Sequence, residues 1–309
     1  MSGGGAATVV TVRGPVPAAD LGLVLPHEHL FIDLLREYRG TGLLADEGLA
    51  VEELARFRDA GGGTLVDCTS EGLGRSPMAL RRVSEATGVA IVMGAGHYRR
   101  PYLDEARIDA RSVDQLAEDI VRDLEAGVGD TGIRAGIIGE IGCDRTISAI
   151  EERVFRAAAR AHRRTGATIT THAARWPVGE VQLDLLAEEG VDPGRVIIGH
   201  CDMVPDAAYH ARLARRGAWV QFDTIQGAHE ADTRRRLEWI RGLVDAGLEG
   251  RLLLSHDVCL TSDLAAYGGP GYAYLLTGFR DRMLEAGFAE SLLTTLMVDN
   301  PRRALTGAD

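Results

Sequence analysis

The stretch IEERVFRAAARAHRRTGATITTH, residues 150–172, decides the fold class. Its first part, Ile150–Thr165, has the apolar spacing of an amphipathic helix, and Gly166 follows where a helix commonly ends. A short β-branched run, Thr168–Thr171, comes next, and His172 stands directly after it. The pattern therefore predicts a helix, a glycine turn, a buried strand and a polar residue at the carboxyl end of that strand.

Similar units recur along the whole chain. The apolar runs are continuous rather than alternating, which is typical of parallel strands covered on both faces. We expect these strands at Leu23–Pro26, Thr64–Thr69, Ala90–Gly94, Gly136–Ile141, Thr168–Thr171, Arg195–Gly199, Ala218–Phe222 and Leu252–Ser255. Helical patterns lie between them, at Val51–Ala60, Ser76–Thr87, Ser112–Ala126, Ile150–Thr165, Val178–Glu189, Pro205–Arg216 and Thr233–Ala246.

This alternation predicts an α/β protein, a single (β/α)8 TIM barrel that spans residues 1–309 as one domain. The segment TVVTVRGPV, residues 8–16, predicts a short β-hairpin before the barrel. A doubly wound open sheet is the alternative, but such sheets usually have fewer strands.

Composition excludes several classes of function. A hydrophobic fraction of 45% and a charged fraction of 26% are ordinary for a soluble enzyme of 309 residues. The formal net charge of −11, without a basic block, argues against nucleic acid or an anionic membrane surface as a partner. The 34 basic residues are all arginine. The lack of lysine excludes Schiff-base lysines, P-loop lysines and carboxylated-lysine metal bridges.

The cysteines and the first residues bear on location. Cys68, Cys143, Cys201 and Cys259 are far apart and form no CxxC motif, so we expect free thiols in a reducing cytoplasm. The opening MSGGGAATVV lacks the charged and apolar segments of a signal peptide. Apolar runs of ~18 residues, the length that spans a membrane, are also lacking. We therefore expect a cytoplasmic protein.

A His-x-His motif follows the first expected strand. His27 and His29 are two residues apart, so on a strand both imidazoles point to the same face while Glu28 points away. Two converging imidazoles are a common start of a metal site. By itself the motif is weak evidence, because histidines are also found as hydrogen-bonded core residues.

Other ligand-type residues stand at the ends of later strands. Glu140 lies in the fourth strand, His172 and His200 follow the fifth and sixth, and Asp257 follows the eighth. In a barrel these ends form the active-site face. We expect His27, His29 and Asp257 to hold one divalent metal ion, His172 and His200 to hold a second, and Glu140 to bridge them. Zinc is the first choice, with manganese, cobalt or iron as alternatives.

The chain resembles the phosphotriesterase family of the amidohydrolase superfamily. The resemblance covers nearly the whole chain from Leu25 onward. It is carried by the segments LPHEHLFID (25–33), GEIGCD (139–144), TTHAARW (170–176), IIGHCDM (197–203), LLLSHDVCL (252–260) and VDNPRRAL (298–305). It implies that Asp257 both binds metal and accepts a proton from the hydrolytic water. It also implies that Tyr98, in GHYRRP (96–101), stands beside the metals as it does in lactonase-like members.

The sequence departs from the family pattern at two positions. Most members bridge the metals with a carboxylated lysine, whereas this chain has Glu140, as in the subgroup called phosphotriesterase homology protein. A carboxylate supplies the same charge and two oxygens on a shorter side chain. After the seventh strand, phosphotriesterases carry a histidine and many lactonases an arginine. Here QFDTIQ (221–226) places Thr224 there, which argues against the phosphotriesterase proton relay.

The resemblance implies a metal-dependent hydrolase in which a metal-bridging hydroxide attacks an ester-type bond. The expected substrate is a small lactone or carboxylic ester. The alternatives are a phosphotriesterase, an amidase or deaminase of the same superfamily, and a metal-containing binding protein without turnover. We expect no organic cofactor, and a homodimer remains open. His256 is expected to be a supporting residue rather than a ligand, while Trp176, His97 and His229 could line the pocket.

Overall fold

The structure, a computed structural model, describes residues 7–227 and 229–307. Its centre is an eight-stranded parallel sheet in the order β12-β11-β10-β9-β8-β7-β6-β3, curled into a nearly closed barrel. The strands are β3 (Leu23–Glu28), β6 (Gly62–Asp67), β7 (Ala90–Ala95), β8 (Ile137–Gly142), β9 (Ile169–His172), β10 (Val196–Ile198), β11 (Trp219–Phe222) and β12 (Leu252–Leu254). The predicted barrel is confirmed.

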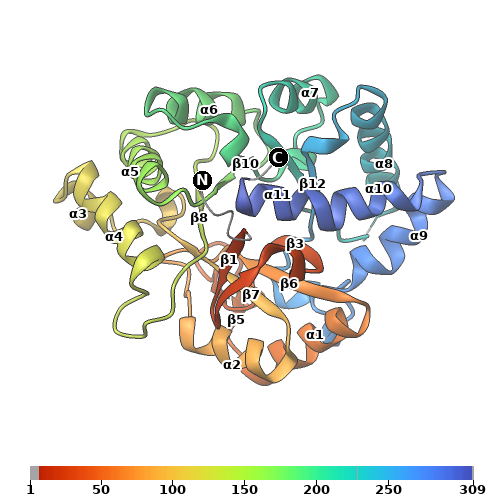
Figure 1. Ribbon diagram of the computed structural model, residues 1–309, viewed down its shortest axis with the longest axis horizontal. Helices are drawn as coiled ribbons and strands as arrows, with labels where there is room; N and C mark the ends of the chain where they lie inside the picture. Colours follow the sequence, from red (N-terminus) through yellow and green to blue (C-terminus); the bar gives the residue numbers. More distant parts are fainter. Residues whose placement is uncertain (1–6, 228, 308–309) are drawn as a thin grey trace, which may run out of the picture.

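Helices surround the barrel (Figure 1). The helix α5 (Ala149–Thr165) begins with a capping box between Ser148 and Glu151. It ends at Gly166, whose φ of 73° is left-handed. The helices are α1 (Glu47–Asp59), α2 (Pro77–Thr87), α3 (Glu105–Asp109), α4 (Val113–Glu125), α5 (Ala149–Thr165), α6 (Gly179–Glu188), α7 (Ala207–Arg215), α8 (Glu230–Asp245), α9 (Gly278–Glu285), α10 (Glu290–Thr294) and α11 (Asn300–Thr306).

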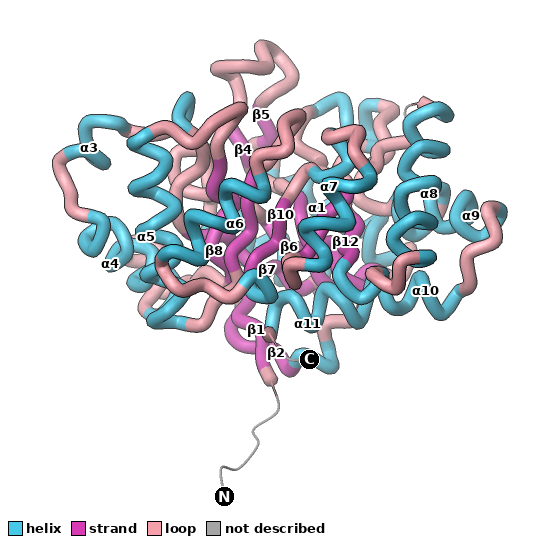
Figure 2. The backbone as a smooth tube through the Cα atoms, turned by 90° about the horizontal axis from the view of Figure 1, so that it is seen from above, coloured by secondary structure: helices cyan, strands magenta, loops and turns pink. Residues whose placement is uncertain are grey.

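The two ends of the barrel are covered differently (Figure 2). Below the strands lie α11 and the predicted N-terminal hairpin, which is present as β1 (Thr8–Thr11) paired with β2 (Gly14–Pro17). Above them lies a second hairpin that the sequence did not predict, β4 (Ile32–Asp33) with β5 (Leu43–Leu44). In the described part of the chain, no helix is long and apolar enough to cross a membrane.

The lower part of the barrel is filled by a separate apolar cluster. It joins strand residues to Val9 of β1 and to Ala304 of α11. Trp219 is 2% exposed, and its indole N–H donates to the Gly194 carbonyl oxygen at 3.0 Å. The hairpin and α11 therefore pack against the apolar cluster that fills this end of the barrel.

Glu28 joins the first strand to the last. One of its carboxylate oxygens accepts hydrogen bonds from the Ser255 hydroxyl at 2.8 Å and from the His256 backbone N–H at 2.8 Å. The other oxygen accepts from the Val258 N–H at 2.9 Å. Since β3 and β12 are the outer strands in the sheet order, this buried carboxylate completes the closure of the barrel.

Candidate metal centre

A cavity of about 660 Å³ opens at the carboxyl ends of the strands. Its lining comes from strand ends and from the loops that follow them, as is usual for a barrel of this kind. The lining includes the predicted site residues His29, Tyr98, Glu140, His172, His200 and Asp257. Trp176 and Thr224 also line it, whereas His97 and His229 do not.

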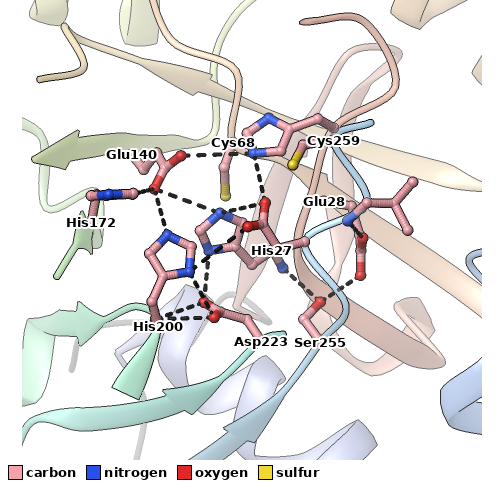
Figure 3. Close-up of polar contacts among 12 residues, drawn as sticks. His27, Glu28, Cys68, Glu140, His172, His200, Asp223, Ser255 and Cys259 are labelled. Carbon is pink, nitrogen blue, oxygen red and sulfur yellow. Dashed lines mark hydrogen bonds and ion pairs between the residues drawn. The ribbon is translucent and has the colours of Figure 1, made fainter. Parts of the chain in front are cut away.

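Glu140 lies among four imidazoles (Figure 3). Its Oε1 is 3.7 Å from His29 Nε2, and its Oε2 is 3.7 Å from His27 Nε2. The same Oε2 is 3.3 Å from His172 Nδ1 and 3.3 Å from His200 Nε2. The two histidine pairs thus share one carboxylate.

Asp257 lies on the side of the first pair. Its Oδ1 is 3.3 Å from His29 Nε2 and 3.8 Å from His27 Nε2. Its Oδ2 is also 3.9 Å from His200 Nδ1, so the structure brings all the ligand candidates from the sequence into one cluster.

The donor atoms fit divalent metal ions. His27 Nε2, His200 Nε2 and Glu140 Oε2 are buried and have no hydrogen-bond partner, although buried polar atoms almost always have one. In each of the groups His27–His29–Glu140 and Glu140–His172–His200, the ligand atoms lie within 4.8 Å of one another. Imidazole nitrogens and carboxylate oxygens are the ligands that zinc and its neighbours prefer.

Asp223 holds two of the imidazoles from behind. Its carboxylate oxygens are 3.0 Å from His27 Nδ1 and 2.8 Å from His200 Nδ1. A proton fixed on Nδ1 leaves the Nε2 lone pair free for a metal. Thr69 Oγ1 stands in the same relation to His29, 2.8 Å from its Nδ1.

Asp223 is not among the ligand candidates predicted from the sequence. The available signal was its position directly after β11, the place that the other candidates occupy on their own strands.

His172 is oriented differently from the other three histidines. Its Nδ1, not its Nε2, faces Glu140, and the Tyr98 hydroxyl is 3.0 Å from that same nitrogen. Tyr98 is thus placed beside the histidine cluster, where the resemblance put it. Tyr98 is 5% exposed and lines the cavity.

The carboxylates and imidazoles of the cluster shift one another's pKa. Burial by itself would raise the pKa of the Glu140 carboxyl, but His27, His172 and His200 hold that pKa well below its usual range. Burial lowers the pKa of His27, yet Glu140 and Asp223 among its neighbours raise that pKa well above its usual value. Carboxylates buried around imidazoles in this way attract positive charge to the centre.

Two candidate ligands have an unusual backbone conformation. His200 (φ 56°) and Asp257 (φ 53°) are left-handed, which costs a residue with a Cβ about 1–2 kcal/mol. The His200 N–H donates to the Asp223 carboxylate at 3.0 Å, and the Asp257 N–H donates to the His27 carbonyl at 3.2 Å. Contacts within the site therefore hold the two residues in place.

Thr224 belongs to an ion-pair network. Its hydroxyl donates to Asp202 at 2.7 Å and accepts from Arg236 at 2.7 Å, and Arg236 Nε donates to Asp202 at 2.7 Å. Asp202 also accepts the Asp223 N–H at 3.1 Å. The position that a histidine would occupy in a phosphotriesterase relay is thus part of a support for Asp223.

His256 is not directed at the cavity. Its Nδ1 is 2.9 Å from Glu28, and its Nε2 accepts the Leu275 N–H at 2.9 Å. The expectation that it is a supporting residue agrees with these contacts.

Comparisons with known proteins identify relatives of this chain. The sequence profile of the phosphotriesterase family matches residues 7–305. The chain is 36% identical to the phosphotriesterase homology protein of Escherichia coli, over 91% of this chain and 96% of that protein. It is 32% identical to the N-acetyltaurine hydrolase of Dictyostelium discoideum, over 84% and 73% of the two chains. A solved lactonase structure from Listeria monocytogenes has a TM-score of 0.89 at 30% identity, over 98% of this chain and 100% of that one.

Proposed function

This chain belongs to the phosphotriesterase family, and we propose that it is a binuclear metal-dependent hydrolase that cleaves lactones or other carboxylic esters. The observation that carries the proposal is the position of Glu140 between two histidine pairs. In that cluster His27 Nε2, His200 Nε2 and Glu140 Oε2 are buried without a hydrogen-bond partner. His27, His29 and Asp257 would hold one metal ion and His172 and His200 the other, with Glu140 between them. Two such cations, with zinc as the first choice, would polarise the substrate oxygen and lower the pKa of a bound water.

Asp257 is the proton acceptor in this proposal. The attacking water has to lose a proton as it bonds to the carbonyl carbon, and a carboxylate next to that water is suited to accept it. The Asp257 side chain is 19% exposed and that of Glu140 3%. Asp257 can therefore pass the proton on toward solvent or the leaving alcohol, whereas Glu140 is confined to holding the centre together.

Tyr98 orients the substrate. Its hydroxyl lies at the edge of the histidine cluster, 3.0 Å from His172 Nδ1. A phenol is protonated at neutral pH and can donate a hydrogen bond to an oxygen of the substrate. Donors placed where negative charge develops are a large source of rate enhancement in acyl transfer.

Thr224 argues for a carbonyl substrate over a phosphotriester. A threonine hydroxyl cannot shuttle a proton near neutral pH, and this one is engaged with Asp202 and Arg236. The similarity to the Listeria lactonase supports the same choice.

Amide hydrolysis is the second candidate. It is favoured by the similarity to proteins named N-acetyltaurine hydrolase, because the same residues can direct water at an amide carbon.

The test is a panel of lactones, carboxylic esters, amides and phosphotriesters on one metal-reconstituted preparation. We expect the best lactone or ester to exceed the best phosphotriester in kcat/KM by at least ~10²-fold, or about 2.7 kcal/mol. A phosphotriester that matches every lactone and ester would overturn the assignment. An amide as the best substrate would select the second candidate.

A further inference from the structure

We propose that Arg175 binds an anionic group on the substrate, so that esters or lactones bearing a carboxylate, sulfonate or phosphate are preferred over neutral ones. The inference rests on the proposed hydrolysis for its reaction. It concerns a residue outside the candidate metal ligands and can be tested by binding alone.

The backbone around Arg175 sets this residue apart. In residues 7–227 and 229–307, the non-glycine residues with positive φ are His200, Asp257 and Arg175, the last at φ 66°. All three line the same cavity. The Trp176 N–H donates to the Ala174 carbonyl oxygen at 2.8 Å, which closes a three-residue turn centred on Arg175.

A functional demand explains an arginine at that position. Glycine adopts the left-handed conformation without steric cost, and a turn that only had to reverse the chain would be served by it. Side chains held in such conformations cluster at active sites and ligand clamps. The other two residues of this kind are candidate metal ligands, so the third is expected to contact the substrate as well.

The charge of Arg175 is not neutralised within the described part of the chain. Arg99, the other arginine of the cavity, is bonded to Glu37 and lies 3.3 Å from Asp144. Arg175 makes no hydrogen bond or ion pair in residues 7–227 and 229–307, although the protein carries a formal net charge of −11. One cavity arginine thus serves the fold, and the other is free for a ligand.

The size and chemistry of the cavity suit a substrate with a reacting carbonyl at one end and an anionic group at the other. A cavity of about 660 Å³ holds a small molecule of ordinary size. Its reacting carbonyl would lie at Glu140 and its anionic group at Arg175. A guanidinium forms two parallel hydrogen bonds with a carboxylate, sulfonate or phosphate. Tyr38 and Trp176, which are 40% and 44% exposed, add aromatic surface to the same cavity.

The first experiment compares monophenyl adipate with its carboxamide-capped counterpart, which has the same scissile bond and length but no charge. The metal-loaded protein should prefer the anionic ester in kcat/KM by at least about tenfold, mainly through KM. Arg175→Gly should abolish that preference, because kcat/KM should fall at least about tenfold more for the anionic ester than for the capped one. The variant should not lower Tm, because glycine suits the left-handed position. Arg175→Lys should retain part of the preference.

Arg145→Gln is the matched control. It removes the same charge from an arginine that is stacked on Trp176, 4.8 Å from the ring centroid, and that does not line the cavity. It should change the preference less than about twofold. If both variants lose the preference equally, the preference comes from positive charge in general and the proposal is overturned. An unchanged preference in Arg175→Gly would also overturn it.

Calorimetry with product analogues separates this proposal from the proposed function. Adipate and hexanoate share one carboxylate, and only adipate has a second, distant one. Adipate should bind the metal-loaded protein at least about tenfold more tightly, and Arg175→Gly should remove the difference. Equal binding of the two acids overturns the role of Arg175. If the binding difference is present but no ester, lactone or amide is turned over, the hydrolase proposal fails while Arg175 remains an anion site.

Discussion

The two ends of the barrel interior contrast sharply. The lower end contains the apolar cluster of Val66, Ile137, Leu253 and Trp219, sealed by the hairpin and α11. The upper end buries His27, Glu140, His200 and Asp223, each at most 2% exposed. Burial of apolar surface stabilises a fold, whereas a buried charge stabilises it only when paired. The lower end therefore stabilises the fold, whereas burying charged groups at the upper end costs free energy and creates a site that attracts cations.

The largest effect is expected for Glu140→Ala. Without the shared carboxylate, two cations would face each other with less negative charge between them, so at least one should be lost. Elemental analysis should show about two metal ions per chain in the parent protein and one or fewer in the variant, with turnover lost. A variant that keeps both metal ions would remove Glu140 as the bridge. Circular dichroism of the same sample checks that the variant is folded.

Asp257→Asn should have the next largest effect. The amide keeps the shape of the side chain but cannot accept a proton, and general acid–base roles are worth ~10²–10⁴-fold in rate. We expect kcat to fall within this range while Tm stays unchanged. Elemental analysis of the same sample separates loss of the base from loss of metal. Near-parental turnover with full metal would exclude Asp257 from the chemistry.

Asp223→Asn tests the support behind the imidazoles. The asparagine has only one oxygen to accept the protons of His27 and His200, so one ring loses its partner. Residues in this position typically change metal affinity by about 10–100-fold, and a competition titration with a chelator should show a drop of this size. Arg236→Gln is the control. Arg236 donates to Asp202, which in turn accepts the Asp223 N–H, so this variant should have a smaller effect on metal affinity.

Substitutions at the lower end should reduce stability rather than activity, so the smallest effect on activity is expected there. Leu253→Ala opens a cavity in the apolar cluster and should cost about 2–5 kcal/mol of unfolding free energy in denaturant titrations. Metal content and kcat/KM should remain within about twofold of the parental values. Val181→Ala, at a 53% exposed position, is the control for the loss of apolar side-chain atoms without a cavity. A large loss of activity in Leu253→Ala would show that the two ends are not independent.

The sequence predicted the barrel and the cluster because both follow a repeated local pattern. Each expected strand was a continuous apolar run, and His172, His200 and Asp257 stood at or just beyond such runs. Parallel strands in a barrel bring those ends together, so spacing along the chain was enough to place the residues.

Features that depend on tertiary contacts could not be predicted in this way. The hairpin β4–β5 has two-residue strands, too short to show any alternation. The role of Asp223 depends on His27, which lies in the first strand. The left-handed backbone at Arg175 has no local signal, since that conformation is usually marked by glycine.

Glu28 gives the assembly of the centre an order in time. This residue stands between His27 and His29, and it joins them to Ser255, 227 positions further along the chain. Contacts between such distant segments carry a high entropic cost of loop closure and tend to form late. His27 of β3 and His29 just beyond it therefore meet Asp257 only when the last strand has docked. A chain still emerging from the ribosome lacks one side of the centre. A metal ion bound by His27, His29 and Asp257 would thus indicate that the last strand has docked.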